Sequence, residues 1–137
     1  MKLNPYLNFN GQCKEAFELY AKVLGGKIEG MMTWGDSPAA GHAPAEMHDK
    51  ILHAYMVVGD QALMASDSPP ENYEKPQGTY VAINLTDTQE GQRIFDALAE
   101  NGTVQMPFEK TFWADGFGML VDRFGTPWMV NCGPASS

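Results

Sequence analysis

Three histidines are the side chains best suited to metal binding or proton transfer in this sequence. His42 and His48 fall in a stretch rich in Gly, Pro and Ala, whereas His53 lies in a run typical of a strand. The spacing of His48, Asp49 and His53 fits neither a helical pair nor a closed metal site, and loop histidines are usually solvated. Two interpretations of His53 stay open: a histidine hydrogen-bonded within a sheet or at a dimer interface, or a general base at a pocket edge.

The two cysteines give little support to nucleophilic catalysis. Cys13 begins a predicted helix, where a thiol pKa can fall, but its place on the apolar stripe of that helix favours burial. No Cys-His-Asp order, Gly-x-Ser-x-Gly elbow, phosphate loop or dinucleotide fingerprint is found in the sequence. Cys13 and Cys132 are also too few for a secreted disulfide framework, so we expect a reducing, cytoplasmic setting.

Strands and one helix are predicted to position these residues in the first half of the chain. The apolar residues of 13–24 recur three and four apart, as in a helix that Gly25-Gly26 ends. Gly59-Asp60 is a typical tight turn between two strands. The apolar residues of region 34–49 do not recur at a regular spacing, so this region is predicted to be a long loop. The expected strands cover 6–9, 27–33, 51–58 and 61–66.

The same order of elements is predicted again in the second half, after a polar, Pro-rich connector over 67–78. Asp87, followed three residues later by Glu90, marks the start of a helix that Asn101-Gly102 ends. A Phe- and Trp-rich loop is expected over 107–116. The expected strands cover 79–85, 103–106, 117–121 and 128–132.

The two halves therefore predict an internal repeat. Gly26 and Gly102 are 76 residues apart, and the same shift places Phe9 on Leu85. A duplicated βαβββ unit gives an α+β fold, in which two curved mixed sheets, each with one helix on its convex side, surround a central cleft. The expected boundaries are module one over about 1–67, a linker over about 68–77, and module two over about 78–133.

Composition narrows the classes of partner. The 137 residues are enough for one domain, and a net charge of −8 argues against nucleic acid and against an anionic membrane surface. No apolar run has the length of a membrane span, and the first residues lack a signal-peptide core. The 9 Met, 7 Phe, 5 Tyr and 3 Trp can either fill a core or line an adaptable apolar pocket.

Motifs along nearly the full chain carry a resemblance to a known family. They are Pro5 to Gly11, Glu15 to Tyr20, Leu24-Gly25-Gly26, Trp34-Gly35-Asp36, Ala62 to Asp67, Thr111 to Ala114, Gly116-Phe117-Gly118 and Asp122 to Asn131. In this order they resemble the PhnB-like branch of the vicinal-oxygen-chelate superfamily, which includes glyoxalase I, bleomycin-resistance proteins and extradiol dioxygenases. The resemblance implies paired βαβββ modules and a homodimer. It implies little about chemistry, because this fold carries many activities.

Metal-dependent members of the superfamily take four ligands from the first and last strands of their two modules. The corresponding positions in this sequence are Pro5, Met64, Val81 and Met129. None of these side chains offers the oxygen or imidazole ligand that such a divalent metal requires. We therefore predict no cofactor, with a divalent metal as the less favoured alternative. Phosphonate binding and methyl transfer, two activities associated with the branch, lack the convergent cations and the cofactor loop that they would need.

The expected ligand site is apolar, aromatic and thioether in character, with few polar groups. Its predicted lining is Tyr6, Asn8, Met64, Ser66, Val81, Ile83, Trp113, Phe117, Met119, Met129 and Asn131, with Trp128 and Asn131 near the rim. The loops 34–49 and 107–116 would cover it, with Trp113 as the residue to test first. In the alternative interpretation, these side chains fill a solid core.

Three functions fit the sequence. The first is binding of a small, largely apolar molecule in the inter-module cleft without a metal. The second is an enzyme of the lyase, isomerase or dioxygenase type, with or without a metal, in which His53 is the one weak catalytic candidate. The third is a structural or regulatory dimer without a ligand.

Overall fold

The structure is a computed structural model that describes residues 1–134 and divides the chain into two compact units. The first unit is Met1–Glu74, and the second begins at Lys75, within the predicted linker. Each unit contains a four-stranded mixed sheet with one α-helix packed on one of its faces. In the described part of the chain, neither helix has the length and apolar character needed to span a membrane.

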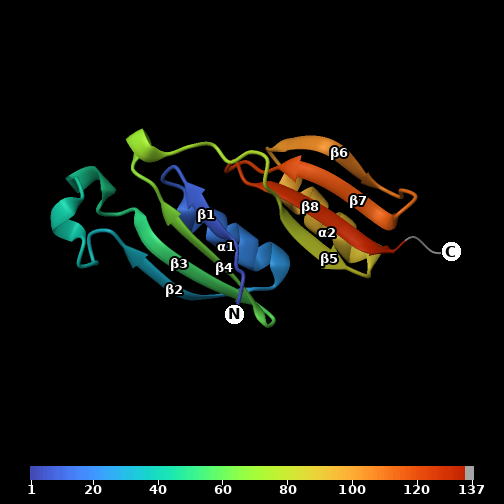
Figure 1. Cartoon of the computed structure of the whole chain (residues 1–137), viewed down its shortest axis with the longest axis horizontal. Helices are drawn as coiled ribbons and strands as arrows, with labels where there is room; N and C mark the ends of the chain where they lie inside the picture. The colour runs from blue at the N-terminus through green and yellow to red at the C-terminus, as the bar shows by residue number, and fades with distance from the viewer. Residues whose placement is uncertain (135–137) are drawn as a thin grey trace. The chain divides into compact units, whose positions relative to one another are not determined.

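The first unit has the predicted βαβββ order (Figure 1). Its strands run β1-β4-β3-β2 across the sheet, with β1 parallel to β4 and the other neighbours antiparallel. The long connection between β1 and β4 is what lets these two strands pair in parallel. The elements are β1 (Tyr6–Phe9), α1 (Cys13–Leu24), β2 (Lys27–Thr33), β3 (Ile51–Val58) and β4 (Gln61–Asp67).

Helix α1 buries its apolar stripe against one face of this sheet. The buried side chains of the helix include Phe17 and Tyr20, whose rings lie 6.5 Å and 6.3 Å from the ring of Phe9 in β1. Gly25 ends the helix with a φ of 69°, the left-handed conformation that glycine adopts without strain. The sheet residues on the covered face are Phe9, Ala54, Met56, Leu63 and Ala65, all buried.

The region 34–49, predicted as a loop without regular structure, contains two single-turn 3₁₀ helices, η1 (Ala40–His42) and η2 (Ala45–Met47). Nε2 of His48 lies 3.2 Å from the carbonyl oxygens of both Ala40 and Ala43, so its N–H donates a hydrogen bond that holds the two turns together. The buried side chain of Met47 anchors the region to the unit.

The second unit repeats the topology, with strand order β5-β8-β7-β6 and the same parallel outer pair (Figure 1). The predicted duplication and α+β fold class are therefore confirmed. Asp87 caps the helix by accepting hydrogen bonds from the backbone N–H groups of Gln89 and Glu90. The elements are β5 (Val81–Leu85), α2 (Thr88–Ala99), β6 (Thr103–Glu109), β7 (Ala114–Val121) and β8 (Pro127–Pro134); η3 (Pro70–Asn72) lies in the connector.

The prediction of a loop over 107–116 is wrong. Strand β6 extends to Glu109 and β7 begins at Ala114, which leaves a turn of four residues between them. Phe108 belongs to the helix-covered core, where its ring lies 5.7 Å from that of Phe95 in α2. A side chain at Gly116 or Gly118 would collide with these rings, so the two glycines of β7 make the close packing possible.

Candidate functional site

The uncovered face of the first sheet combines aromatic, thioether and polar side chains. Strand register places Tyr6 beside Met64 and Met64 beside Tyr55, so these three share a face. Asn8 pairs with Ser66 on the same face, one step farther along. The predicted site residues Tyr6, Asn8, Met64 and Ser66 are thus brought together on one surface.

A hydrogen-bonded cluster forms the polar centre of this face. The hydroxyl oxygen of Tyr6 lies 2.8 Å from Oγ of Ser66 and 3.4 Å from Nδ1 of His53. The rings of Tyr6 and His53 are 6.0 Å apart. The side chains come from the three strands β1, β3 and β4, and Tyr6 and His53 are exposed. His53 is therefore a polar group on an accessible surface, linked through Tyr6 to a second hydroxyl.

The uncovered face of the second sheet is more apolar. Met129 of β8 pairs with Met119 of β7, and Asn131 pairs with Phe117. Asn131 also lies beside Asn84 of β5, to whose Oδ1 its Nδ2 donates a hydrogen bond of 3.3 Å. Four predicted site residues, Phe117, Met119, Met129 and Asn131, therefore share one face.

Trp113 borders this surface from the turn between β6 and β7. Its ring lies 5.3 Å from that of Phe117 and 4.8 Å from that of Phe112, in edge-to-face contacts. Trp113 is 44% exposed and Phe112 is 90% exposed. The two adjacent rings give this end of the sheet an exposed aromatic surface.

Three predictions for the second unit are wrong. Val81 and Ile83 pair with Trp128 and Val130, which face α2, so both lie on the covered face rather than in the predicted lining. Trp128 is not at a rim: it is fully buried, and its Nε1–H donates a 2.8 Å hydrogen bond to Oδ2 of Asp122. The apolar residues of β5 alternate with Ala82 and Asn84, and the helix covers the apolar set.

The four positions that correspond to the metal ligands of chelating relatives do not form a metal site in this structure. Met64 and Met129 lie on uncovered faces, Val81 lies under α2, and Pro5 precedes β1 and accepts a hydrogen bond from the backbone N–H of Met64. Across residues 1–134, no three His, Cys, Asp or Glu side chains gather closely enough to hold a metal ion. The residues present therefore do not fit the metal of chelating relatives.

Both cysteines are buried, free thiols. Burial, reinforced by the carboxylate of Asp67, raises the pKa of Cys13 to about 12. Burial also raises the pKa of Cys132, with smaller effects from Asp87 and Asp115. A thiol with a raised pKa is a poor nucleophile because little of it is ionised near neutral pH.

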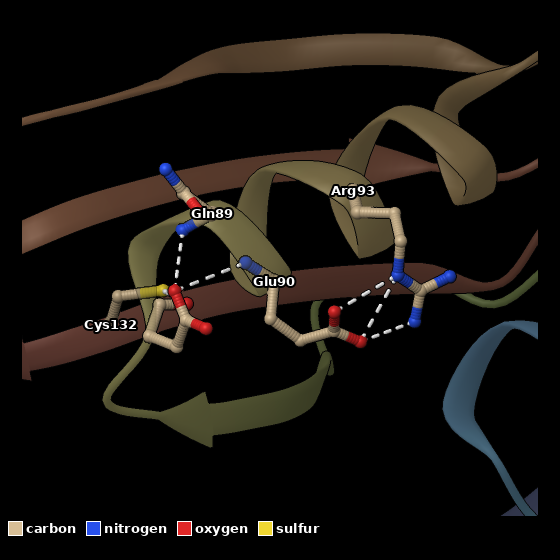
Figure 2. Close-up of polar contacts among 5 residues, drawn as sticks. Gln89, Glu90, Arg93 and Cys132 are labelled. Carbon is tan, nitrogen blue, oxygen red and sulfur yellow. Dashed lines mark hydrogen bonds and ion pairs between the residues drawn. The ribbon is translucent and has the colours of Figure 1, made fainter.

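Figure 2 shows Cys132 of β8 beside the start of α2. Its sulfur donates a weak hydrogen bond of 3.7 Å to the backbone oxygen of Asp87, whose carboxylate caps the helix. One turn farther on, Arg93 and Glu90 form an exposed ion pair on the helix surface. These contacts stabilise the start of the helix.

Sequence reasoning missed Asn84 and Tyr55 as residues of the uncovered faces. The 76-residue repeat contained the signal for Asn84, because it relates Asn8 to Asn84 and Phe9 to Leu85. Applied consistently, the repeat places Ile83 with Leu7 on the covered face. Tyr55 lay on the same side of its strand as His53, but sequence alone could not decide which side the helix covers.

Comparison with known proteins connects this geometry to a family. A family model described as 3-demethylubiquinone-9 3-methyltransferase matches residues 1–131. Protein YjdN of Escherichia coli K12 is 35% identical over 139 residues, covering 96% of this chain and 95% of YjdN.

Solved structures agree with the fold. The crystal structure of PA1353 from Pseudomonas aeruginosa has 52% identity and a TM-score of 0.89, with 96% of this chain and 97% of that chain covered. A PhnB protein from Bacillus cereus, described as a putative 3-demethylubiquinone-9 3-methyltransferase, has a TM-score of 0.82 at 21% identity, with 97% of this chain and 100% of that chain covered. The chain therefore belongs to the family described as 3-demethylubiquinone-9 3-methyltransferase, and it shares its fold with a PhnB protein, in agreement with the resemblance to PhnB-like proteins.

Proposed function

We propose that this protein binds a small, largely apolar molecule on the uncovered faces of its sheets, without the family's usual metal. The observation that supports this most is the pairing of Met129 with Met119 and of Asn131 with Phe117 on one uncovered face. Thioether and aromatic side chains with one or two polar groups are typical of small-ligand sites. The predicted cleft between the modules stays a prediction.

A neutral fluorescent probe tests the binding. N-phenyl-1-naphthylamine should bind the wild-type protein, and Phe117→Ala and Met129→Ala should each weaken binding at least tenfold, because each removes apolar contact area worth about 1.5–3 kcal/mol. Leu3→Ala is the matched control, since Leu3 is apolar but 92% exposed near the N-terminus. Absence of binding, or equal affinity in all variants, would contradict the proposal.

The same probe tests whether Trp113 covers the ligand. If Trp113 covers the ligand, Trp113→Ala should release the probe faster; an unchanged dissociation rate would rule out a covering role.

Metal analysis of protein purified without chelators should find no stoichiometric Zn, Ni, Fe or Mn. A full equivalent of any of these would overturn the metal-free part of the proposal.

A second candidate is a metal-free acid–base enzyme of the isomerase type, favoured by the Tyr6, His53 and Ser66 cluster. In one arrangement of protons Ser66 donates to Tyr6 and Tyr6 donates to His53; in the other, all donors and acceptors are reversed. A switch from the first arrangement to the second takes up a proton at Ser66, one end of the hydrogen-bonded series, and releases a proton from His53 at the other end. A substrate that loses a proton at one atom and gains one at another would use both ends.

Acetylacetone is a neutral probe for this activity, because its enol and keto forms interconvert by such a proton shift. The protein should accelerate the loss of enol absorbance after dilution into water, and Tyr6→Phe or His53→Gln should reduce the acceleration at least tenfold. Tyr55→Phe, on the same face, is the control and should match the wild type. No acceleration by the wild type, or equal loss in the control, would contradict this candidate.

We also propose a cytoplasmic homodimer, as the family resemblance implies. The exposed apolar side chains Met32, Val104 and Met106 on the edge strands β2 and β6 support an association surface. Light scattering coupled to size-exclusion chromatography should give twice the mass of the chain. A monomer mass at micromolar concentration would contradict the dimer.

A further inference from the structure

Asn131 carries a buried hydrogen-bond acceptor that nothing in the described residues satisfies. Its Oδ1 is shielded from solvent and accepts no hydrogen bond, whereas its Nδ2 donates to Oδ1 of Asn84 at 3.3 Å. A buried polar atom that has lost its hydrogen bond to water is unfavourable unless another donor replaces it. In native proteins such an atom therefore needs an explanation.

The surroundings of Asn131 indicate what would supply the donor. Phe117 lies directly across on β7, and Trp113 contacts the ring of Phe117 edge-to-face at 5.3 Å. The next pair along the same face is Met119 and Met129. Flexible thioethers can move aside for a planar group and contact its ring favourably, and aromatic edges pack against another aromatic ring. The acceptor thus lies among side chains suited to an aromatic body.

We propose that Oδ1 of Asn131 accepts a hydrogen bond from a ring N–H or a phenolic O–H of an aromatic ligand. The ligand class is then an aromatic heterocycle or phenol that carries a donor, in preference to a plain hydrocarbon or an alkylated analogue. Asn84 holds the amide by its nitrogen end, so the buried oxygen end accepts from the ligand once neighbouring side chains move aside for it. This inference rests on the proposed binding function and specifies its ligand.

Indole and 1-methylindole form a matched pair of probes, since they differ in the N–H that the methyl group replaces. Isothermal titration calorimetry on the full-length protein should show indole binding about tenfold more tightly than 1-methylindole, the effect of one hydrogen bond to a buried acceptor. Asn131→Leu should reduce this ratio to about one. Leu3→Ala is the control and should keep the preference, because Leu3 is 92% exposed near the N-terminus and is no part of the proposed site.

A stability measurement separates the ligand role from a structural one. If Oδ1 is unsatisfied without ligand, Asn131→Leu should melt at the wild-type temperature or above it, because it removes an unpaired acceptor. A markedly lower melting temperature would show that the oxygen is satisfied within the protein and would overturn the proposal. Asn131→Val serves as a second variant if the leucine overfills the site.

The outcomes distinguish this inference from the binding function. Equal affinity of the wild type for both probes would contradict the hydrogen bond and leave apolar binding supported. Tighter binding of 1-methylindole would also overturn the inference. Failure of both probes to bind would contradict the inference together with the proposed aromatic site, whereas N-phenyl-1-naphthylamine tests apolar binding separately.

Discussion

Asp67 is a buried carboxylate that joins distant parts of the first unit. Its Oδ1 accepts a hydrogen bond from the backbone N–H of Cys13, and its Oδ2 accepts one from that of Ile51, both at 2.9 Å. It therefore fixes the start of α1 and the start of β3 to the end of β4. In the second unit, Asp122 organises the turn before β8 by accepting from the backbone N–H groups of Phe124 and Thr126.

We predict that Asp67→Asn destabilises the protein by about 1–3 kcal/mol, because the amide NH₂ would face a backbone donor in place of an acceptor oxygen. Urea unfolding followed by circular dichroism measures this free energy. Asp60→Asn is the control: Asp60 lies exposed in the turn between β3 and β4, and its substitution should change stability by less than about 0.5 kcal/mol. Equal effects of the two substitutions would contradict the role of Asp67.

The thiol of Cys13 predicts an alkaline dependence of stability. Its pKa is raised to about 12 in the folded protein from 9.0, so above pH 9 the unfolded chain releases a proton that the folded chain retains. Stability is therefore fully present below pH 9 and falls as the pH rises toward 12, by about 1.4 kcal/mol per pH unit. The free energy of unfolding measured in urea should fall between pH 8 and pH 10 by about 1 kcal/mol more in the wild type than in Cys13→Ala. The same difference in both proteins would contradict the assignment.

At the scale of elements, close contact between α2 and its sheet depends on residues without side chains. Gly91 lies in the helix directly over the sulfur of Cys132, and Gly118 lies in β7 under the ring of Phe95. These glycines bring the helix near the sheet, as small residues do at close-packed surfaces. Asp87 caps the helix four residues before Gly91, so the cap and the close packing lie about one turn apart.

Gly91→Ala should therefore destabilise the protein, although alanine favours helix formation by about 1 kcal/mol over glycine. The added methyl group collides with Cys132 and is close to Phe108, so we expect a net loss of about 1–3 kcal/mol. Gly30→Ala in β2 is the control, since nothing lies within 4 Å of an added Cβ there. Thermal melts compare the two, and a more stable Gly91→Ala protein would show that the contact relaxes freely.

The order of helices and strands could be predicted, because periodic apolar residues mark the elements and glycines mark their ends. Which face of each sheet the helix covers could not be predicted. Gly25-Gly26 and Gly59-Asp60 mark ends that the structure confirms. The extension of β6 and β7 was missed because Pro107 and Gly116 are typical of loops, and only tertiary contact of Phe108 with Phe95 makes those segments strands. The Tyr6, His53 and Ser66 cluster could not be foreseen, since it depends on the register of three strands.

At the scale of the whole molecule, the chain is one topology used twice, joined by a connector with little regular structure. Each unit has its own sheet, its own helix and its own buried core. The connector around Glu71 and Glu74 is exposed and contains only the short turn η3. Such segments are the preferred sites of proteolytic cleavage.

Limited digestion with a protease specific for glutamate should therefore cut first after Glu71 or Glu74 and give two large fragments. Mass spectrometry of the earliest products identifies the site. Glu18 is also exposed but lies in α1, and the bond after it should stay intact over the same interval. An initial cut within α1 or α2 would contradict the division into two units.

The parallel pairing of β1 with β4 also affects how the chain is made. Tyr6 has its sheet partner at Met64, so the first strand and the helix after it emerge from the ribosome well before the strand that completes their sheet. Translation to about Asp67 supplies every strand of the first sheet, while the partners of β5 in β8 are still untranslated. Because N-terminal domains fold first during synthesis, the nascent first unit can close before the second one exists.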